Sequence, residues 1–345
     1  MRLPAEWEKQ SGVQLTWPDE STPWYELPEV QRCYAHIAEA VLRRESLLVV
    51  TADDAACRSR LAEIIRSDGM DLDVEKIQFQ EAPLNDTWAR DHGGIAVWGD
   101  KGERYLYDFV FNGWGLKFAS DHDNRITRNI FFQNAFAPEV MCVDMRPFVL
   151  EGGSIDCDGK GTLMATSECL LSDNRNEYLT QEEIEAELKQ AFGLKRVLWL
   201  EHGGIAGDDT DSHVDILARF APDDTIVYTA CDDPSDENYA PLKAMEEDLR
   251  TFRTLDGKPY RLISLPLPEA MYLEDYRLPA SYANFLVVNG AVLVPGAGSE
   301  RDKVAAERIA KAFPGRDVEV IDCRPLLSGH GGLHCVTMNF PEGYM

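Results

Sequence analysis

The chain closes with Leu326-Leu327-Ser328-Gly329-His330-Gly331-Gly332-Leu333-His334-Cys335, followed by the strand-like run Val336-Thr337-Met338. Chain ends usually tolerate change, but this one carries three glycines, two histidines and a cysteine. Glycine lets a backbone turn sharply and approach a ligand closely. A cysteine directly after such a turn can face a substrate, or it can be a packed residue that opens an edge strand. The segment alone is compatible with both interpretations.

The composition describes an acidic globular protein. Its 345 residues are enough for one large domain or two ordinary ones, and a hydrophobic content of 44% argues against global disorder. Lys and Arg number 34 and Asp and Glu number 60, which gives a net charge of −26. This charge argues against nucleic acid or an anionic membrane as a partner and is compatible with a cationic substrate, although solubility alone explains much of it.

Eight cysteines are spread along the chain without a C-x-x-C pair, so neither a zinc ribbon nor a thioredoxin motif is indicated. The opening residues 1–7 lack the apolar run of a signal peptide, and no apolar run reaches the length of a membrane span. We therefore expect a cytoplasmic protein whose cysteines are reduced thiols.

Apolar periodicity and turn residues predict a repeating order of elements. We expect helices over residues 28–44, 54–67, 121–136, 180–192, 239–252 and 301–313, and single strands over 77–79, 140–144, 197–200, 262–265 and 318–321. Hairpin-like pairs join 94–98 with 105–111, 154–157 with 162–165, 213–220 with 225–229, and 285–288 with 292–294. Helices that recur about every 60 residues, each with a hairpin and a strand, predict an α/β protein of radial architecture. No low-complexity linker interrupts the order, so we expect a single domain over residues 1–345.

Polar loops follow several of these strands and collect carboxylates. Asp91 ends the loop 85–91 and lies just before a glycine pair, where it is either a site residue or an ordinary turn or helix-capping aspartate. Glu151 follows the apolar run 148–150, and an acid at the end of a buried strand is costly unless it is paired. Both acids are candidates for a functional site.

The segment Gly207–Asp215 carries four acids and a histidine. If it runs into the strand 213–220, alternation places His213 and Asp215 on one face and Val214 on the other. A polar pair on an otherwise apolar strand indicates a site rather than packing. A calcium loop is the alternative, but the EF-hand spacing with its terminal glutamate is absent.

These residue types suit one kind of chemistry. A cysteine nucleophile reacts as the thiolate, and histidine is its usual acid/base partner near neutral pH. Two aspartates placed across a planar cation suit a guanidinium, whose N–H donors form a fork. The residues therefore permit a Cys-His-Asp-Asp site that acts on a guanidine.

Seven segments together resemble the agmatine deiminase and Porphyromonas-type peptidylarginine deiminase family. They are Pro4–Glu8, Thr16–Pro18, Asn85–Asp91, Phe111–Gly115, Leu150–Ser154, Gly203–Asp215 and Gly331–Cys335, and they span the chain in order. The resemblance implies the pentein fold, a five-bladed α/β propeller of ββαβ units around a central active site.

The same resemblance implies roles for individual residues. Cys335 would be the nucleophile and His213 the acid/base, Asp91 and Asp215 would grip the guanidinium, and Glu151 would orient His213. The segments that form the substrate pocket in the family contribute Asp86, Trp88, Trp114, Asp211 and Gly332 as expected substrate-binding residues. The resemblance implies no metal and no organic cofactor.

Two motifs depart from the agmatine deiminase pattern. The chain reads Gly-His-Gly-Gly-Leu-His-Cys over residues 329–335, where agmatine deiminases typically read Gly-Gly-Gly-Asn-Ile-His-Cys. Ser212 stands before the histidine, where the family usually has glycine. These departures bear on the identity of the substrate and leave the chemical residues in place.

We expect agmatine, a small cationic guanidine, to be hydrolysed to N-carbamoylputrescine and ammonia through a covalent amidino-cysteine, as in putrescine and polyamine biosynthesis. Acids near the motif loops (Asp86, Asp208, Asp209 and Asp211) outnumber the lone Arg90, which favours a dication over an arginine carboxylate.

The alternatives are a peptidylarginine or free-arginine deiminase, a Cys-His-Asp amidase, and a non-catalytic pentein-fold binding protein. A homodimer is compatible with the sequence.

Overall fold

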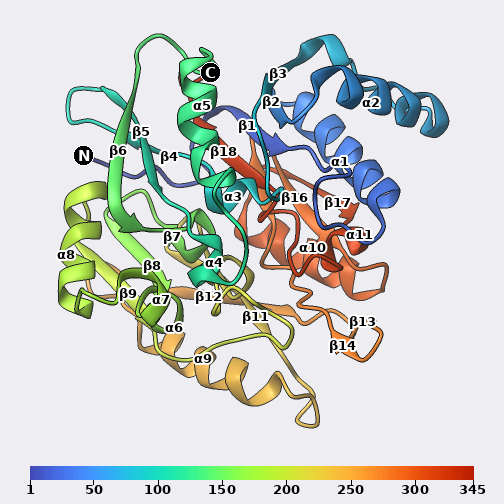
Figure 1. Cartoon of the computed structure of the whole chain (residues 1–345). Coiled ribbons are helices and arrows are strands. Elements are labelled where there is room, and N and C mark those ends of the chain that lie inside the picture. Colours follow the sequence, from blue (N-terminus) through green and yellow to red (C-terminus); the bar gives the residue numbers. More distant parts are fainter.

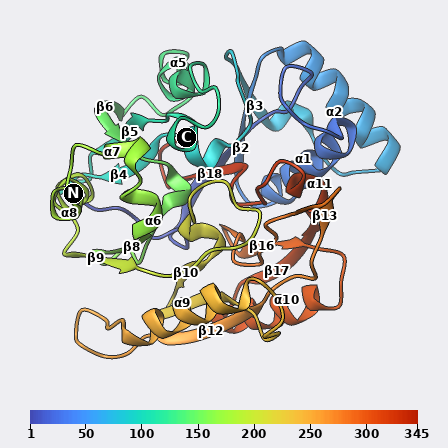
Figure 2. The same ribbon diagram turned by 60° about the horizontal axis from the view of Figure 1, so that its bottom comes forward.

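The computed structural model describes residues 1–345 as a mixed α/β protein built from several small sheets (Figure 1). The longer helices α1 (Leu27–Leu42), α2 (Asp54–Asp68), α5 (Ile126–Phe132), α8 (Gln181–Phe192), α9 (Tyr239–Thr251) and α10 (Arg301–Ala312) lie toward the outside in Figures 1 and 2. The short helices are α3 (Ala89–His92), α4 (Gly113–Leu116), α6 (Ser167–Leu170), α7 (Asp173–Asn176) and α11 (Arg324–Leu327). Single 3₁₀ turns occur at Val74–Lys76, Asp123–Arg125, Gly152–Ser154 and Val214–Ile216.

Four of the sheets repeat one pattern, an antiparallel pair followed by a parallel strand that arrives after a helix. They consist of β4 (Ile95–Trp98), β5 (Arg104–Val110) and β6 (Val140–Val149); β7 (Ile155–Cys157), β8 (Thr162–Thr166) and β9 (Arg196–Leu200); β10 (Ala218–Ala221), β11 (Thr225–Ala230) and β12 (Arg261–Pro266); and β15 (Leu286–Val288), β16 (Ala291–Gly296) and β17 (Asp317–Asp322). The helices supply the long crossover that parallel strands require.

The fifth sheet joins the two ends of the chain. The last strand, β18 (Thr337–Pro341), pairs antiparallel with β1 (Gln10–Thr16), which continues in parallel to β2 (Ser46–Thr51) and then β3 (Ile77–Glu81). A separate hairpin is formed by β13 (Tyr272–Leu273) and β14 (Tyr276–Arg277). Because β18 starts two residues after Cys335, this pairing ties the cysteine loop to the first strand of the chain.

Apolar side chains between helices and sheets form the core. In α1, Val30, Tyr34, Ile37 and Val41 are buried at helical spacing, which places them on one face against the neighbouring sheet. In β18, Phe340 is fully buried and meets Phe136 edge to face at a ring separation of 5.1 Å. The C-terminal strand is therefore part of the core rather than a loose end.

The predicted order of helices, hairpins and strands is confirmed, with differences in extent. The helix expected over 121–136 is a 3₁₀ turn followed by α5, and the strand expected over 140–144 continues to Val149. No helix is both long and apolar enough to cross a membrane.

The strand expected over 213–220 is wrong in its first half. His213 precedes the 3₁₀ turn Val214–Ile216, and β10 begins only at Ala218. Asp211 and Ser212 both have positive φ values, 66° and 64°, so the chain bends sharply before the histidine. Strand alternation therefore does not bring His213 and Asp215 together, and the turn has to place them instead.

The closing strand gives a test of the core. Phe340→Ala should lower the free energy of unfolding by about 3–5 kcal/mol, because it removes a buried ring that the surrounding aromatic side chains cannot replace. Phe132→Ala is the matched control, since that ring is 80% exposed. Urea unfolding of both variants measures the difference, and equal midpoints would contradict the role of β18 in the core.

Candidate active site

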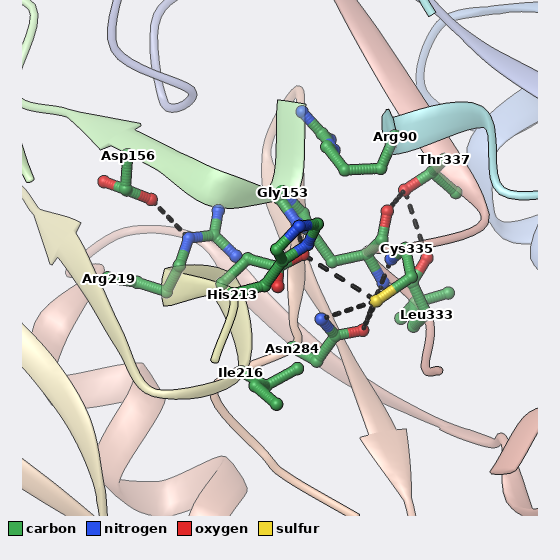
Figure 3. Close-up of polar contacts among 12 residues, drawn as sticks. Arg90, Gly153, Asp156, His213, Ile216, Arg219, Asn284, Leu333, Cys335 and Thr337 are labelled. Carbon is green, nitrogen blue, oxygen red and sulfur yellow. Dashed lines mark hydrogen bonds and ion pairs between the residues drawn. The ribbon is translucent and has the colours of Figure 1, made fainter. Parts of the chain in front are cut away.

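The thiol of Cys335 lies in the interior at the end of the glycine-rich loop (Figure 3). Its Sγ accepts a hydrogen bond from Nδ2 of Asn284 at 3.2 Å and lies 3.8 Å from Oδ2 of Asp215. A β-carbon at Gly331 would collide with the ring of Trp88, so this position has to be glycine for the loop to pack as it does. The loop thus holds the thiol against an amide on one side and a carboxylate on another.

Asp91 comes from the short helix α3 and is buried beside the imidazole of His213. Its Oδ2 accepts from Nε1 of Trp114 at 3.0 Å, and its Oδ1 accepts from the backbone N–H of Gly153 at 3.0 Å. Nδ1 of His213 lies 3.6 Å from the same Oδ1. The carboxylate is therefore held firmly in one orientation.

Asp215 lies in the 3₁₀ turn after His213 and is fully buried. Nδ1 of His334 lies 2.8 Å from its Oδ2, while its Oδ1 is buried without any hydrogen-bond partner in the protein. An unpaired carboxylate oxygen in the interior is costly, so this atom is available for a donor from a ligand.

Glu151 lies close to His213 but is held by another residue. Both of its oxygens accept from Nε of Arg175 at 3.0 Å, and Nη1 of Arg175 donates to Asp211 at 2.7 Å. No hydrogen bond joins Glu151 to His213, so any influence of this acid on the imidazole is electrostatic rather than a direct contact.

Cys169 completes a small cluster behind the imidazole. The ligating atoms of Glu151, Cys169 and His213 all lie within 4.8 Å of one another, which makes this the one set of such groups close enough to share a metal ion. The guanidinium of Arg175 already occupies both oxygens of Glu151, and a second cation beside it would be repelled. We therefore assign no metal to this cluster.

Burial and neighbouring charges shift the acid–base groups of the site. Burial by itself lowers the pKa of His213, but the Asp91 carboxylate and then Cys169 and Glu151 raise it to about 10. Burial raises the pKa of Asp91 to about 6, with His213 opposing the increase. Burial, and then the Asp215 and Asp91 carboxylates, hold the pKa of the Cys335 thiol well above its ordinary value. Before a ligand binds, the site therefore contains an imidazolium and a protonated thiol.

A cavity of about 240 Å³ opens onto this group. Its wall includes Cys335, Asp91, Asp86, Trp88 and Trp114, so five of the residues predicted from the sequence share one pocket. Burial raises the pKa of Asp86 to about 6. The pocket combines aromatic surfaces with carboxylates, as an organic cation requires.

Two predicted substrate-binding residues lie outside this wall. Asp211 pairs with Lys117 at 2.5 Å and with Arg175, so its charge is already neutralised. Gly332 packs against Asn284, where an added β-carbon would lie 2.5 Å from the amide oxygen. We infer that both residues shape the loops around the pocket rather than contact a ligand.

The sequence profile of the Porphyromonas-type peptidyl-arginine deiminases matches residues 2–341. The chain belongs to this family.

Individual relatives of the family cover almost the whole chain. The agmatine deiminase of Stutzerimonas stutzeri is 32% identical, over 99% of this chain and 96% of its own length. A Porphyromonas gingivalis protein, provisionally named an arginine deiminase, has a crystal structure with a TM-score of 0.91 at 49% identity, covering 99% of each chain. The substrate-bound agmatine deiminase of C. jejuni has a TM-score of 0.89 at 36% identity, covering 100% of this chain and 97% of its own.

Several residues of this family member's site were missed by sequence reasoning. Asn284 touches the thiol, Arg175 neutralises Glu151, and Phe118 lies in the pocket wall. Only Asn284 had a local signal, since a polar residue directly precedes the apolar strand predicted at 285–288. The others take part through contacts between distant segments, which no local pattern reports.

The buried ion pair behind His213 gives a second test. Arg175→Met should destabilise the fold by about 3–5 kcal/mol, because it leaves Glu151 charged and uncompensated in the interior. Arg146→Met is the control, since Arg146 and its partner Asp144 are both about half exposed and such a pair contributes at most about 1 kcal/mol. Thermal or urea unfolding distinguishes the variants; similar stabilities would show that Glu151 needs no counterion.

Proposed function

We propose that this protein is a guanidine deiminase that hydrolyses agmatine to N-carbamoylputrescine and ammonia. The observation that carries the proposal is a buried thiol next to the carboxylates of Asp91 and Asp215, with the imidazole of His213 beside them. A thiol amidase would need hydrogen-bond donors for a developing oxyanion, and two carboxylates are the opposite of that. They match a substrate whose reacting carbon carries a positive charge.

Binding comes first in the mechanism. The planar guanidinium donates N–H groups to Asp91 and to the unpartnered Oδ1 of Asp215. Its positive charge offsets the two carboxylates that keep the Cys335 thiol protonated, so substrate binding favours the thiolate. The free protein thus keeps a poorly reactive thiol, and the cation that is to be attacked helps to activate it.

Chemistry then proceeds in two halves. The thiolate of Cys335 attacks the guanidinium carbon, and the imidazolium of His213 donates its proton to the departing nitrogen, which leaves as ammonia. An amidino-cysteine remains. The neutral His213 next removes a proton from water, whose oxygen attacks the same carbon and releases the ureido product and the thiol. Every step is carried by side chains of this chain.

The tail of the substrate decides between agmatine and arginine. Asp86 and Asp209 lie in the pocket wall, and burial raises the pKa of both. Such acids favour the terminal ammonium of agmatine over the carboxylate of arginine. Lys117, the nearby candidate for an arginine carboxylate, is paired with Asp211. Arginine remains the second candidate because the Porphyromonas gingivalis protein named for it is the more similar in sequence, at 49% identity.

The architecture supports the proposal that the fold is a single-domain pentein over residues 1–345. Four sheets share the ββαβ order, and a fifth is completed by β18 pairing with β1. We infer from this order that five such units, with the last strand returning to the first, form a five-bladed propeller with the loops carrying Asp91, His213 and Cys335 at its centre.

Steady-state kinetics test the function. We expect kcat/KM to be higher for agmatine than for arginine or a peptide ending in arginine, because the pocket wall offers carboxylates to the tail. Cys335→Ala should abolish ammonia release while retaining agmatine binding, since both guanidinium-binding aspartates remain. A preference for arginine would move the protein to the second candidate, and turnover by Cys335→Ala near that of the wild type would remove the cysteine from the mechanism.

Binding should depend on pH through Asp91. As the pH falls through about 6, this carboxylate takes up a proton and binding of methylguanidine, which lacks a tail, should weaken. Asp215 keeps its charge over this range, because burial raises its pKa but the neighbouring His334, His213 and Arg219 together lower it by more. Calorimetry on the Cys335→Ser variant from about pH 8 to about pH 5 measures the effect.

Asp91→Asn in the same background is the control. It should bind more weakly at about pH 8, by roughly 1.5–3 kcal/mol for a charge-assisted hydrogen bond, and should lose the pH dependence. A dissociation constant that stays flat in both proteins would mean that Asp91 does not bind the guanidinium.

A further inference from the structure

The proposed reaction leaves one proton without a destination. The Cys335 thiol has to lose its proton before it attacks, but His213 is already an imidazolium and serves as the acid for the leaving nitrogen. Among ionisable side chains, only Asp215 lies within hydrogen-bonding distance of Sγ, at 3.8 Å. The other side chain in contact with the sulfur is the Asn284 amide, which cannot accept a proton at ordinary pH. The path of the thiol proton therefore begins at Asp215.

Asp215 is connected in one direction. Its single side-chain hydrogen bond within the protein, other than that from the thiol, is to Nδ1 of His334 at 2.8 Å. The opposite nitrogen of that ring, Nε2, lies 2.9 Å from Oε2 of Glu6. His334 is 2% exposed, so the ring is shielded from bulk solvent. A carboxylate, an imidazole and a second carboxylate thus form an unbroken chain through the interior.

The chain ends at a second cavity. This space of about 100 Å³ has Glu6 and His334 in its wall together with Arg90, Asp156 and apolar residues of the N-terminal segment. It shares no wall residue with the substrate pocket. A water molecule occupies about 30 Å³, so the cavity is large enough for several waters, and its polar groups can hold them. We call it the rear cavity.

We propose that His334 is a proton relay that carries the thiol proton of Cys335 from Asp215 to Glu6 and on to water in the rear cavity. This inference rests on the proposed deiminase function. The ring starts with its proton on Nε2. The S–H bond breaks and the proton moves to Oδ2 of Asp215, then to Nδ1 of His334, while the proton on Nε2 passes to Glu6 and then to water. One proton leaves the site, the sulfur keeps the electron pair, and release of the product returns a proton to the thiol.

The charges around Glu6 explain why the proton does not stay there. Arg219 forms an ion pair with Glu6 and another with Asp156, and Arg90 also lies near Glu6 without a carboxylate partner of its own. Burial raises the pKa of Glu6, but Arg219 and then His334 outweigh it and hold the pKa far below its usual range. Glu6 therefore binds a proton only in passing and returns to the carboxylate that faces His334.

A second feature agrees with a relay. A histidine that only fixes the position of Asp215 needs one nitrogen for the purpose, and its other face can pack against apolar groups. Here both nitrogens face carboxylates, and the second carboxylate, that of Glu6, lies 328 residues away from His334 in the sequence. Imidazole is the one side chain that can accept a proton on one atom and release another from the opposite atom near neutral pH.

Stopped-flow mixing with agmatine and a pH-indicator dye, in weak buffer, tests the relay. In the wild type, one proton should appear in solution as the amidino-cysteine forms, before released ammonia takes a proton up. In His334→Gln, which keeps hydrogen-bonding groups but cannot relay, proton release and adduct formation should slow on the order of 10²-fold. Adding His334→Gln to the Cys335→Ser variant should change the agmatine dissociation constant by no more than about twofold. If His334 only held the structure of the site, the same change would weaken agmatine binding.

Two further variants complete the experiment. Glu6→Gln removes the last carboxylate of the relay and leaves Asp215 unchanged, so it should slow the same two steps. It therefore tests the relay even if His334→Gln does not fold. His202→Gln is the matched control, because His202 is an exposed histidine paired with Asp248 and should behave as the wild type.

Each result has a distinct meaning. Adduct formation in the wild type without early proton release would overturn the relay, because the thiol proton would then pass to the leaving nitrogen inside the pocket. Wild-type rates in both His334→Gln and Glu6→Gln, or weaker binding with an unchanged rate at saturation, would also overturn it. A wild type that forms no adduct with agmatine or arginine would instead refute the deiminase function itself.

Discussion

A thiol beside two buried carboxylates is the interaction on which the site depends. Carboxylates in the interior have to be compensated, and Asp91 is satisfied by an indole, a backbone N–H and the neighbouring imidazole. Asp215 is satisfied on one oxygen only. The site is therefore electrostatically incomplete until a cation arrives, which links recognition of the guanidinium to activation of Cys335.

Buried carboxylates around the site are also neutralised, by two separate arginine side chains. On one side, Glu151 is neutralised by Arg175 behind His213. On the other, Glu6 and Asp156 share Arg219, whose side chain is 1% exposed. These pairs join the N-terminal segment, β7 and β10, so the same contacts that neutralise charge hold separate sheets in register around the thiol. A buried pair of this kind is costly to break, which makes the centre of the molecule resistant to rearrangement.

The predicted strand over residues 213–220 is wrong in its first half, where the chain bends next to the site. The sequence pattern after Ser212 looks like a strand, because most of the residues from Val214 to Phe220 are apolar. The structure instead has positive φ at Asp211 and Ser212 and a 3₁₀ turn at 214–216. The Asp208 carboxylate accepts hydrogen bonds from the backbone N–H groups of Thr210 and Ser212, which supports the bend. Tertiary contacts there override a preference that the apolar pattern alone would satisfy.

The sequence by itself determined the order of helices and strands, the family, and the residue types able to attack and bind a guanidine, because periodicity and short motifs are properties of neighbouring residues. Only the tertiary structure decided which of those residues meet. The path from Asp215 through His334 to Glu6, the support of the thiol by Asn284, and the neutralisation of Glu151 by Arg175 join segments 24 to 328 residues apart. Such pairings depend on how all the sheets pack, and no local pattern of the chain encodes them.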